Sequence, residues 1–151
     1  MKLGLKDYVY VAIQLLLFIA YILDIEIVNT GSLRYVSVVG IVLIIIGFFM
    51  ILIGILQLNI NISPFPSPKT ASSLITNGIF AYVRHPIYGG LVIGLFGYAL
   101  FFASLYKILI VCLLFVLFMY KSSYEEKRLS ILFPIYDTYK LGTKRIIPFI
   151  Y

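Results

Sequence analysis

Long runs of uncharged, largely apolar residues constrain this chain more than any other feature. The clearest run extends from Tyr35 to Leu58 without a charge, and as a helix it is roughly 36 Å long, enough to cross a bilayer with some tilt. Similar runs cover Tyr8–Leu23, Pro86–Tyr106 and Ile108–Tyr120. Because every backbone polar group must be satisfied within lipid, such runs predict helices. We therefore expect an all-α integral membrane protein, a bundle of about four transmembrane helices forming one domain over residues 1–151.

The composition agrees with a membrane protein. Hydrophobic residues make up 62% of the chain and charged residues only 12%, whereas a soluble domain has about 25% charged residues. The first run, Tyr8–Leu23, also resembles the apolar part of a signal peptide. No small-residue cleavage site follows it, however, and tyrosines lie at its ends as they do at membrane interfaces, so we expect a spanning helix.

The residue inventory excludes several classes of function. The single Cys112 lies inside an apolar run, so one chain forms no disulfide framework and no cysteine-based metal site. The single His85 excludes a histidine-rich metal centre, and we expect no metal. The net charge of +6 is first a signal of membrane topology in such a chain, and we do not expect a nucleic-acid partner.

The segments between the apolar runs are read from their turn residues and charges. Asn29–Ser32 is a turn cluster, and Pro64, Pro66 and Pro68 predict an extended surface loop after the second span. Ser104–Lys107 predicts a tight turn that makes a hairpin of the third and fourth spans. After the fourth span we expect a polar cytoplasmic helix that ends before Pro134. The aromatic and basic stretch Tyr136–Tyr151 is expected to lie on the lipid headgroups as an interfacial tail.

The distribution of lysines and arginines predicts the orientation. With four spans, ten of the 12 basic residues fall on one side of the membrane, and only Arg34 and Lys107 fall on the other. Loops rich in lysine and arginine face the cytoplasm. We therefore expect a protein of the cell membrane with both termini in the cytoplasm, and His85 and Glu125-Glu126 would then meet at the cytoplasmic interface.

The most chemically specific stretch is Arg84-His85-Pro86-Ile87-Tyr88. Proline is well tolerated at the first position of a helix, so Pro86 is expected to open one, with Arg84 and His85 at its positive end. Such a helix start favours an anionic group. Taken alone, Arg84 also fits an interfacial anchor, and Glu125 and Glu126 also fit a solvated helix face. Together the cations and the carboxylates are suited to a zwitterionic ligand.

These motifs resemble a known family. Arg84-His85-Pro86-Ile87-Tyr88, with Leu74–Phe80 before it and Glu125-Glu126 and a Tyr136-x-x-Tyr139 tail after it, is similar to the isoprenylcysteine carboxyl methyltransferases and the related phospholipid methyltransferases. The resemblance covers residues 64–148. It implies an integral membrane enzyme that uses S-adenosylmethionine as its cofactor. No Gly-x-Gly-x-x-Gly motif of the soluble nucleotide-binding fold occurs in the chain.

The resemblance also implies roles for individual residues. Cofactor binding would fall to the following set: Ser73, Leu74, Ile75, Phe80, His85, Pro86, Ile87, Tyr88, Glu125 and Glu126. Arg84 and Lys121 would be the catalytic residues, and Lys121 would face the substrate, at a position where the carboxyl methyltransferases have arginine. Lysine does not make the bidentate carboxylate contact of arginine. Pro134 follows Phe133 where the family usually has glycine.

The resemblance implies a lipophilic or membrane-embedded methyl acceptor, most like a prenylcysteine carboxylate or a lipid headgroup, while a small thiol and a quinone-like molecule also stay open. Two alternatives stay open at this point. The first is a membrane reductase of the sterol type that uses NADPH, because the segment Arg145–Tyr151 is comparable to the C-terminal ends of those enzymes. The second is a non-enzymatic membrane protein whose basic face binds anionic lipid.

Overall fold

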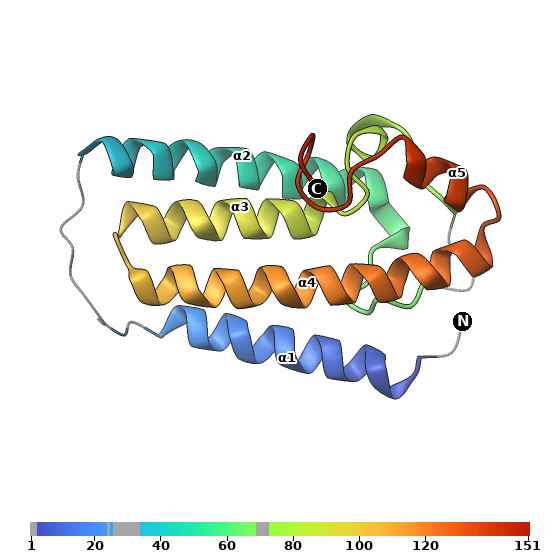
Figure 1. Cartoon of the computed structure of the whole chain (residues 1–151), viewed down its shortest axis with the longest axis horizontal. Coiled ribbons are helices and arrows are strands. Elements are labelled where there is room, and N and C mark those ends of the chain that lie inside the picture. Colours follow the sequence, from blue (N-terminus) through green and yellow to red (C-terminus); the bar gives the residue numbers. More distant parts are fainter. Residues whose placement is uncertain (1–2, 24, 26–33, 69–72) are drawn as a thin grey trace.

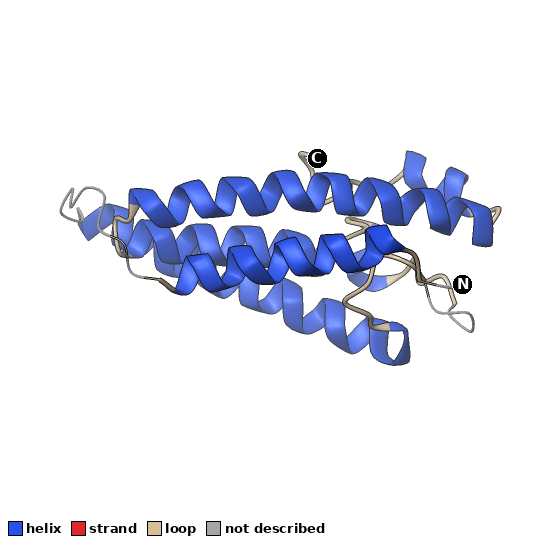
Figure 2. Ribbon diagram, turned by 90° about the horizontal axis from the view of Figure 1, so that it is seen from below, coloured by secondary structure: helices blue, strands red, loops and turns tan. Residues whose placement is uncertain are grey.

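The computed structural model describes residues 3–23, 25, 34–68 and 73–151. The predicted turn Asn29–Ser32 lies outside these residues. Within them the chain is all-α, and its α-helices are α1 (Leu5–Ile22), α2 (Arg34–Leu58), α3 (Pro86–Phe101), α4 (Leu105–Leu132) and α5 (Tyr136–Leu141). In Figure 1 the four longer helices run lengthwise in the order α1, α4, α3, α2, with α5 and the N-terminus at the same end of the bundle. Figure 2 shows the same bundle from below, with the helices in blue.

Three of the described helices are long and apolar enough to cross a membrane. They are Leu5–Ile22, Tyr35–Leu58 and Leu105–Leu132, which confirms the integral membrane bundle and three of its expected spans. The third predicted span, Pro86–Tyr106, is wrong at its end, because α3 stops at Phe101 and is a shorter apolar helix. At 1.5 Å per residue its 16 residues extend roughly 24 Å, less than the hydrocarbon thickness of about 30 Å.

The turn after α3 lies earlier than the predicted Ser104–Lys107. Ala103 adopts a left-handed backbone conformation with φ of 50°, which ends the helix. The Ser104 side chain then accepts a hydrogen bond from the backbone N–H of Lys107, at 3.3 Å, and so caps the start of α4. The sequence did not predict the turn here because Phe101 and Phe102 are apolar and no charged residue or glycine marks its position.

Helices α2 and α3 contact one another backbone to backbone. A Cβ atom built on Gly47 would lie 2.5 Å from the carbonyl oxygen of Gly90, and one on Gly40 would lie 2.6 Å from that of Gly97. Glycines therefore permit this close approach, as small residues do between membrane helices. The contact holds the start of α3 firmly against α2.

Helix α1 is fastened by polar groups spaced seven residues apart. The carboxylate of Asp7 accepts hydrogen bonds from the backbone N–H and the hydroxyl of Ser67, at 2.9 and 2.5 Å. Gln14 accepts one from Lys121, and the hydroxyl of Tyr21 donates to the carbonyl of Leu95 at 2.7 Å. Because lipid supplies no hydrophobic force between helices, such contacts hold α1 in place.

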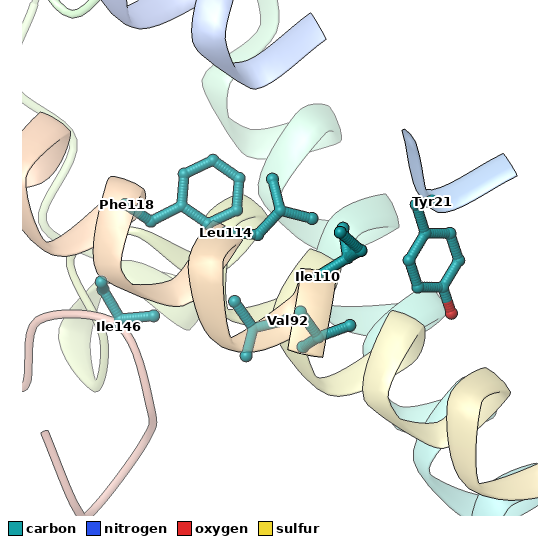
Figure 3. Close-up of a cluster of buried hydrophobic side chains, with 7 residues drawn as sticks. Tyr21, Val92, Ile110, Leu114, Phe118 and Ile146 are labelled. Atoms are coloured by element: carbon teal, nitrogen blue, oxygen red, sulfur yellow. The ribbon is translucent and has the colours of Figure 1, made fainter. Parts of the chain in front are cut away.

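Two segments outside the long helices are more buried than the sequence suggested. Ser67 and Pro66 are buried, so the prediction of a surface loop is wrong at these two residues, which the Asp7 carboxylate draws against α1. Ile146 of the C-terminal tail is fully buried. Figure 3 shows its side chain beside Val92, Leu114 and Phe118, in the hydrophobic core formed by α3 and α4.

Candidate functional site

The C-terminal tail holds the backbone of the Arg84-His85-Pro86 motif. Val83 and Lys144 form an isolated parallel bridge. The backbone N–H of Arg84 donates to the carbonyl of Lys144 at 2.8 Å, and that of His85 donates to the carbonyl of Arg145 at 2.9 Å. Pro86 is the first residue of α3, as the sequence predicted. The motif therefore leaves the preceding loop in a fixed conformation and enters α3 directly.

Aromatic rings stack through the middle of the site. The rings of His85 and Tyr88 lie 5.4 Å apart at an angle of 9°, and those of Tyr88 and Phe118 lie 4.7 Å apart at 5°. The Tyr88 hydroxyl donates to Glu125 Oε2 at 3.1 Å, and His85 Nδ1 lies 3.7 Å from the same oxygen. The first turn of α3 therefore contacts α4 at Glu125.

The two neighbouring glutamates have different surroundings. Glu126 is only 4% exposed, and its Oε1 lies 2.7 Å from Arg84 Nε and 3.3 Å from His85 Nε2. Its Oε2 lies 3.2 Å from Arg145 Nη2. Since two guanidinium groups surround this carboxylate, its charge is balanced within the protein. Glu125 has no such arginine partner among the described residues and faces open space.

Arg84 is committed to this ion-pair cluster and to the tail. Its Nη1 donates to the carbonyl of Lys140 at 3.2 Å, to the carbonyl of Thr143, and to the Thr143 hydroxyl at 3.2 Å. With Nε on Glu126, most of its donors are used by protein groups. Arg84 therefore connects the start of α3 to α4 and to the segment after α5.

Lys121 of α4 is 1% exposed. Its Nζ donates to Gln14 Oε1 at 2.6 Å and to the carbonyl of Pro64 at 2.8 Å. The same atom lies 5.2 Å from the centre of the Tyr88 ring, within cation–π range. Lys121 of α4 thus contacts α1, α3 and the loop that holds Pro64, Pro66 and Pro68, here named the proline loop.

Two adjoining cavities surround these groups. The larger, here named the site cavity, has a volume of about 410 Å³, and the smaller, the recess, about 100 Å³. They share six lining residues: Leu58, Ser63, Phe80, Arg84, His85 and Glu125. Pro86, Ile87, Tyr88 and Lys121 line only the site cavity, whereas Ser73, Leu74 and Ile75 line only the recess. Glu126 is the one sequence-predicted site residue that lines neither cavity.

A third cavity, here named the lateral groove, continues from the site along the apolar part of the bundle. It has a volume of about 500 Å³ and shares Leu91 with the site cavity. Ile44, Phe48 and Ile51 of α2 line one side, and Tyr21 and Ile22 of α1 line the other. An apolar groove between two membrane-spanning helices is suited to a hydrocarbon chain.

Several lining residues were missed by the sequence reasoning. Gln14 lines the site cavity, and its signal was the single amide within an otherwise apolar span. Tyr136 lines the recess and was noted only as part of the tail motif. Ser63 and Pro64 line the site cavity because the proline loop folds inward. Among the described residues no group of three His, Cys, Asp or Glu side chains is placed to hold a metal ion.

Two tyrosines of the α5 segment close the outer side of the recess. The Tyr139 hydroxyl donates to the carbonyl of Phe80 at 2.5 Å, and burial raises the pKa of Tyr139 to about 12. Tyr136 is 1% exposed, and its hydroxyl has no hydrogen-bond partner within the described part of the chain. A buried hydroxyl of this kind is normally paired, so the recess offers one polar group to a ligand.

Comparison with known proteins matches the chain to a protein family. Residues 35–134 fit the family model described as phospholipid methyltransferase. No curated protein matches the chain. The matched residues include α2, the proline loop, α3 and α4, and they leave out α1 and the tail that holds Arg84 and His85.

Proposed function

Since the chain belongs to the phospholipid methyltransferase family, and is thus a membrane methyltransferase that uses S-adenosylmethionine, we propose that it methylates the polar headgroup of a lipid or the carboxylate of a prenylcysteine at the cytoplasmic membrane face. The family assignment implies a lipid-type acceptor. It also favours methyl transfer over the two alternatives, an NADPH-dependent reductase and a non-enzymatic lipid-binding protein.

The observation that carries the proposal is the position of Glu125. This carboxylate lines both the site cavity and the recess, and within the described residues only the Tyr88 hydroxyl donates to it. A half-buried carboxylate with spare acceptor capacity is suited to an ammonium group or to sugar hydroxyls. We propose that Glu125, His85 and Tyr88 bind the cofactor where the two cavities join.

The residues of the two cavities fit the cofactor by size and by chemistry. The site cavity alone, at about 410 Å³, falls in the range of about 300–1,000 Å³ usual for small-molecule sites. The unpaired hydroxyl of Tyr136 and the carboxylate of Glu125 supply polar contacts in the recess. Ser73, Leu74, Ile75 and Phe80 would form its walls, while Pro86 and Ile87 would border the site cavity.

S-adenosylmethionine, when bound, supplies an electrophilic methyl group on a sulfonium. The work left to the protein is alignment of donor and acceptor in a site with little water. Tyr88, held between His85 and Phe118, gives a rigid wall for that alignment. Arg84 and Glu126 act by fixing the start of α3 against α4 and the tail, since their charged groups are paired with one another and with the protein backbone.

The acceptor is proposed to reach the site from the bilayer. Its hydrocarbon tail would lie in the lateral groove between α1 and α2, which meets the site cavity at Leu91. Lys121 lines the site cavity but not the recess, so a headgroup near Lys121 would lie next to the cofactor. We therefore expect Lys121→Ala to raise the KM for the acceptor and to leave cofactor affinity nearly unchanged.

Two topological features complete the proposal. We propose that α3 serves as a fourth, short membrane crossing, and that the end of the bundle with α5 and the site faces the cytoplasm, with both termini there. The support is the charge distribution: the basic residues Lys6, Lys121, Lys127, Lys140 and Lys144 belong to the site end, whereas Lys107 lies at the other.

The proposed function is tested by two measurements on the purified protein in detergent. Isothermal titration with S-adenosylhomocysteine should give saturable binding to one site. Transfer of labelled methyl groups should then be detected for an ethanolamine phospholipid or an S-prenyl cysteine. Binding without transfer to either acceptor would refute the proposed acceptor class, and absence of binding would refute the proposed cofactor site.

A further inference from the structure

Gln14 is an amide in the middle of a membrane-spanning helix. It lies roughly 14 Å along α1 from Leu5, and its neighbours in α1 are apolar. A polar residue at such depth is costly in lipid and commonly marks a functional site. Gln14 also belongs to α1, which lies outside the segment shared with the family.

The orientation of the Gln14 amide is fixed by its partner. An ammonium group donates hydrogen bonds and accepts none, so the amide atom 2.6 Å from Lys121 Nζ is the oxygen. The two N–H donors of the amide must then point elsewhere. In the described residues no group accepts from them, while Gln14 lines the site cavity.

Lys121 has little donor capacity left for a ligand. Two of its protons are directed at Gln14 Oε1 and at the Pro64 carbonyl, and its charge lies over the face of the Tyr88 ring. The ammonium therefore holds the amide of Gln14 in place. Gln14 and Lys121 both line the site cavity, so a headgroup in this cavity is within reach of the N–H donors of Gln14, which the protein leaves for a ligand.

We propose that Gln14 is a specificity-determining residue, whose amide N–H groups bind an anionic oxygen of the acceptor's headgroup, with Lys121 as its positioning residue. This inference rests on the proposed methyltransferase function. The shared chemistry of the ligand is an anionic oxygen attached to a hydrocarbon tail. Either the phosphate diester of a phospholipid or the carboxylate of a prenylcysteine supplies it, and the nearby positive charge of Lys121 strengthens the contact.

The sharpest test is Gln14→Glu. The new carboxylate still accepts from Lys121, so the contact between α1 and α4 remains, but the group that faces the cavity no longer donates. For the acceptor that the wild-type protein methylates, KM should rise about tenfold or more, because a charged hydrogen bond is lost and like charges oppose. The affinity for S-adenosylhomocysteine should stay within about twofold, since Gln14 does not line the recess.

Two further variants separate recognition from folding. Gln57→Glu places the same new charge on α2, where the amide oxygen accepts from the backbone N–H of Ile79 at 3.0 Å and lines neither cavity. Its KM should match wild type. Gln14→Met removes the N–H donors without adding charge and should also raise KM, which keeps the test informative if Gln14→Glu folds poorly.

Three probes identify the source of the oxygen. An ethanolamine phospholipid presents a phosphate diester, an S-prenyl cysteine presents a carboxylate, and dodecylamine presents an amine with no oxygen. Binding of each is also measured without turnover, by displacement of a fluorescent lipid. Gln14→Glu should weaken the phospholipid or the prenyl cysteine, and dodecylamine should be unaffected or bind more tightly.

The result that overturns the inference is an unchanged acceptor KM and displacement constant in a folded Gln14→Glu protein, or an equal loss of dodecylamine binding. That outcome leaves the proposed function intact if the wild-type protein still binds S-adenosylhomocysteine and transfers methyl groups. Failure of the wild-type protein in both assays would instead refute the proposed function.

Discussion

The neighbouring glutamates at the end of α4 provide a direct test of the site, because one change applied to two adjacent residues should have opposite consequences. Glu126→Gln should lower the stability of the protein and affect ligand binding little once the protein is folded. Glu125→Gln should weaken the cofactor and change stability little. Each variant is the control for the other, since size, helix position and loss of one negative charge are matched.

The expected magnitudes follow from the partners of each carboxylate. Glu126 balances Arg84 at 2.7 Å and Arg145 at 3.2 Å, and neither it nor Arg84 is more than slightly exposed. Removing one member of a buried ion pair costs about 3–5 kcal/mol, because the remaining charge stays buried without compensation. Replacing Glu125 leaves no buried arginine without its ion-pair partner among the described residues. Loss of one charge-assisted hydrogen bond to the ligand should weaken S-adenosylhomocysteine by roughly 1.5–3 kcal/mol.

Thermal unfolding in detergent and isothermal titration measure the two effects on the same samples. We expect a clear drop in the unfolding temperature only for Glu126→Gln and a rise in the dissociation constant of about tenfold or more only for Glu125→Gln. If both variants lost affinity equally while keeping wild-type stability, both carboxylates would face the ligand, and the assignment of Glu126 to a structural role would be refuted.

Three other predictions concern packing, pH and topology. Gly47→Ala places a methyl group 2.5 Å from the Gly90 carbonyl and should destabilise the bundle by about 1–3 kcal/mol, measured by thermal unfolding, whereas Gly142→Ala, with no atom within 4 Å, should not. Because burial raises the pKa of Tyr139 to about 12, the folded state keeps this proton to higher pH than the unfolded chain. Its hydrogen bond to Phe80 should stabilise the protein fully below the ordinary tyrosine pKa of about 10 and be lost as pH rises toward 12. Tyr139→Phe should remove this pH dependence of the unfolding temperature. After replacement of Cys112, a cysteine at the exposed Phe102 should react with a membrane-impermeant reagent from outside intact cells, and one at the exposed Asn77 should react only after permeabilisation; equal reactivity would contradict the proposed orientation.

The long apolar runs made much of the fold predictable. Tyr35–Leu58 is bounded by polar residues on both sides, and the predicted run coincides with the helix to within one residue. Pro86 opened α3 as expected, since proline is compatible with only a few helix positions. The end of α3 was missed because Phe101, Phe102 and Ala103 are apolar, so the turn changes neither charge nor hydropathy.

The site was predictable in its local motifs and not in its long-range contacts. Arg84–Tyr88 and the pair Glu125-Glu126 are each contiguous in sequence, so each motif could be recognised without knowledge of the fold. The pairing of Arg145 with Glu126, and of Gln14 with Lys121, joins segments that are far apart in sequence. No periodicity encodes such pairs, because they depend on how the helices pack.

The bridge between Val83 and Lys144 sets the order in which the protein can mature. During synthesis the ribosome releases the Arg84-His85 motif long before Lys144 and Arg145, whose carbonyls hold its backbone. In the interval α3 must form and α4 must fold back along it. The motif lacks its backbone partners throughout that period, and closing so long a loop is slow. Because Arg84 and His85 line both cavities, the formation of these cavities is thereby linked to completion of the C-terminal tail.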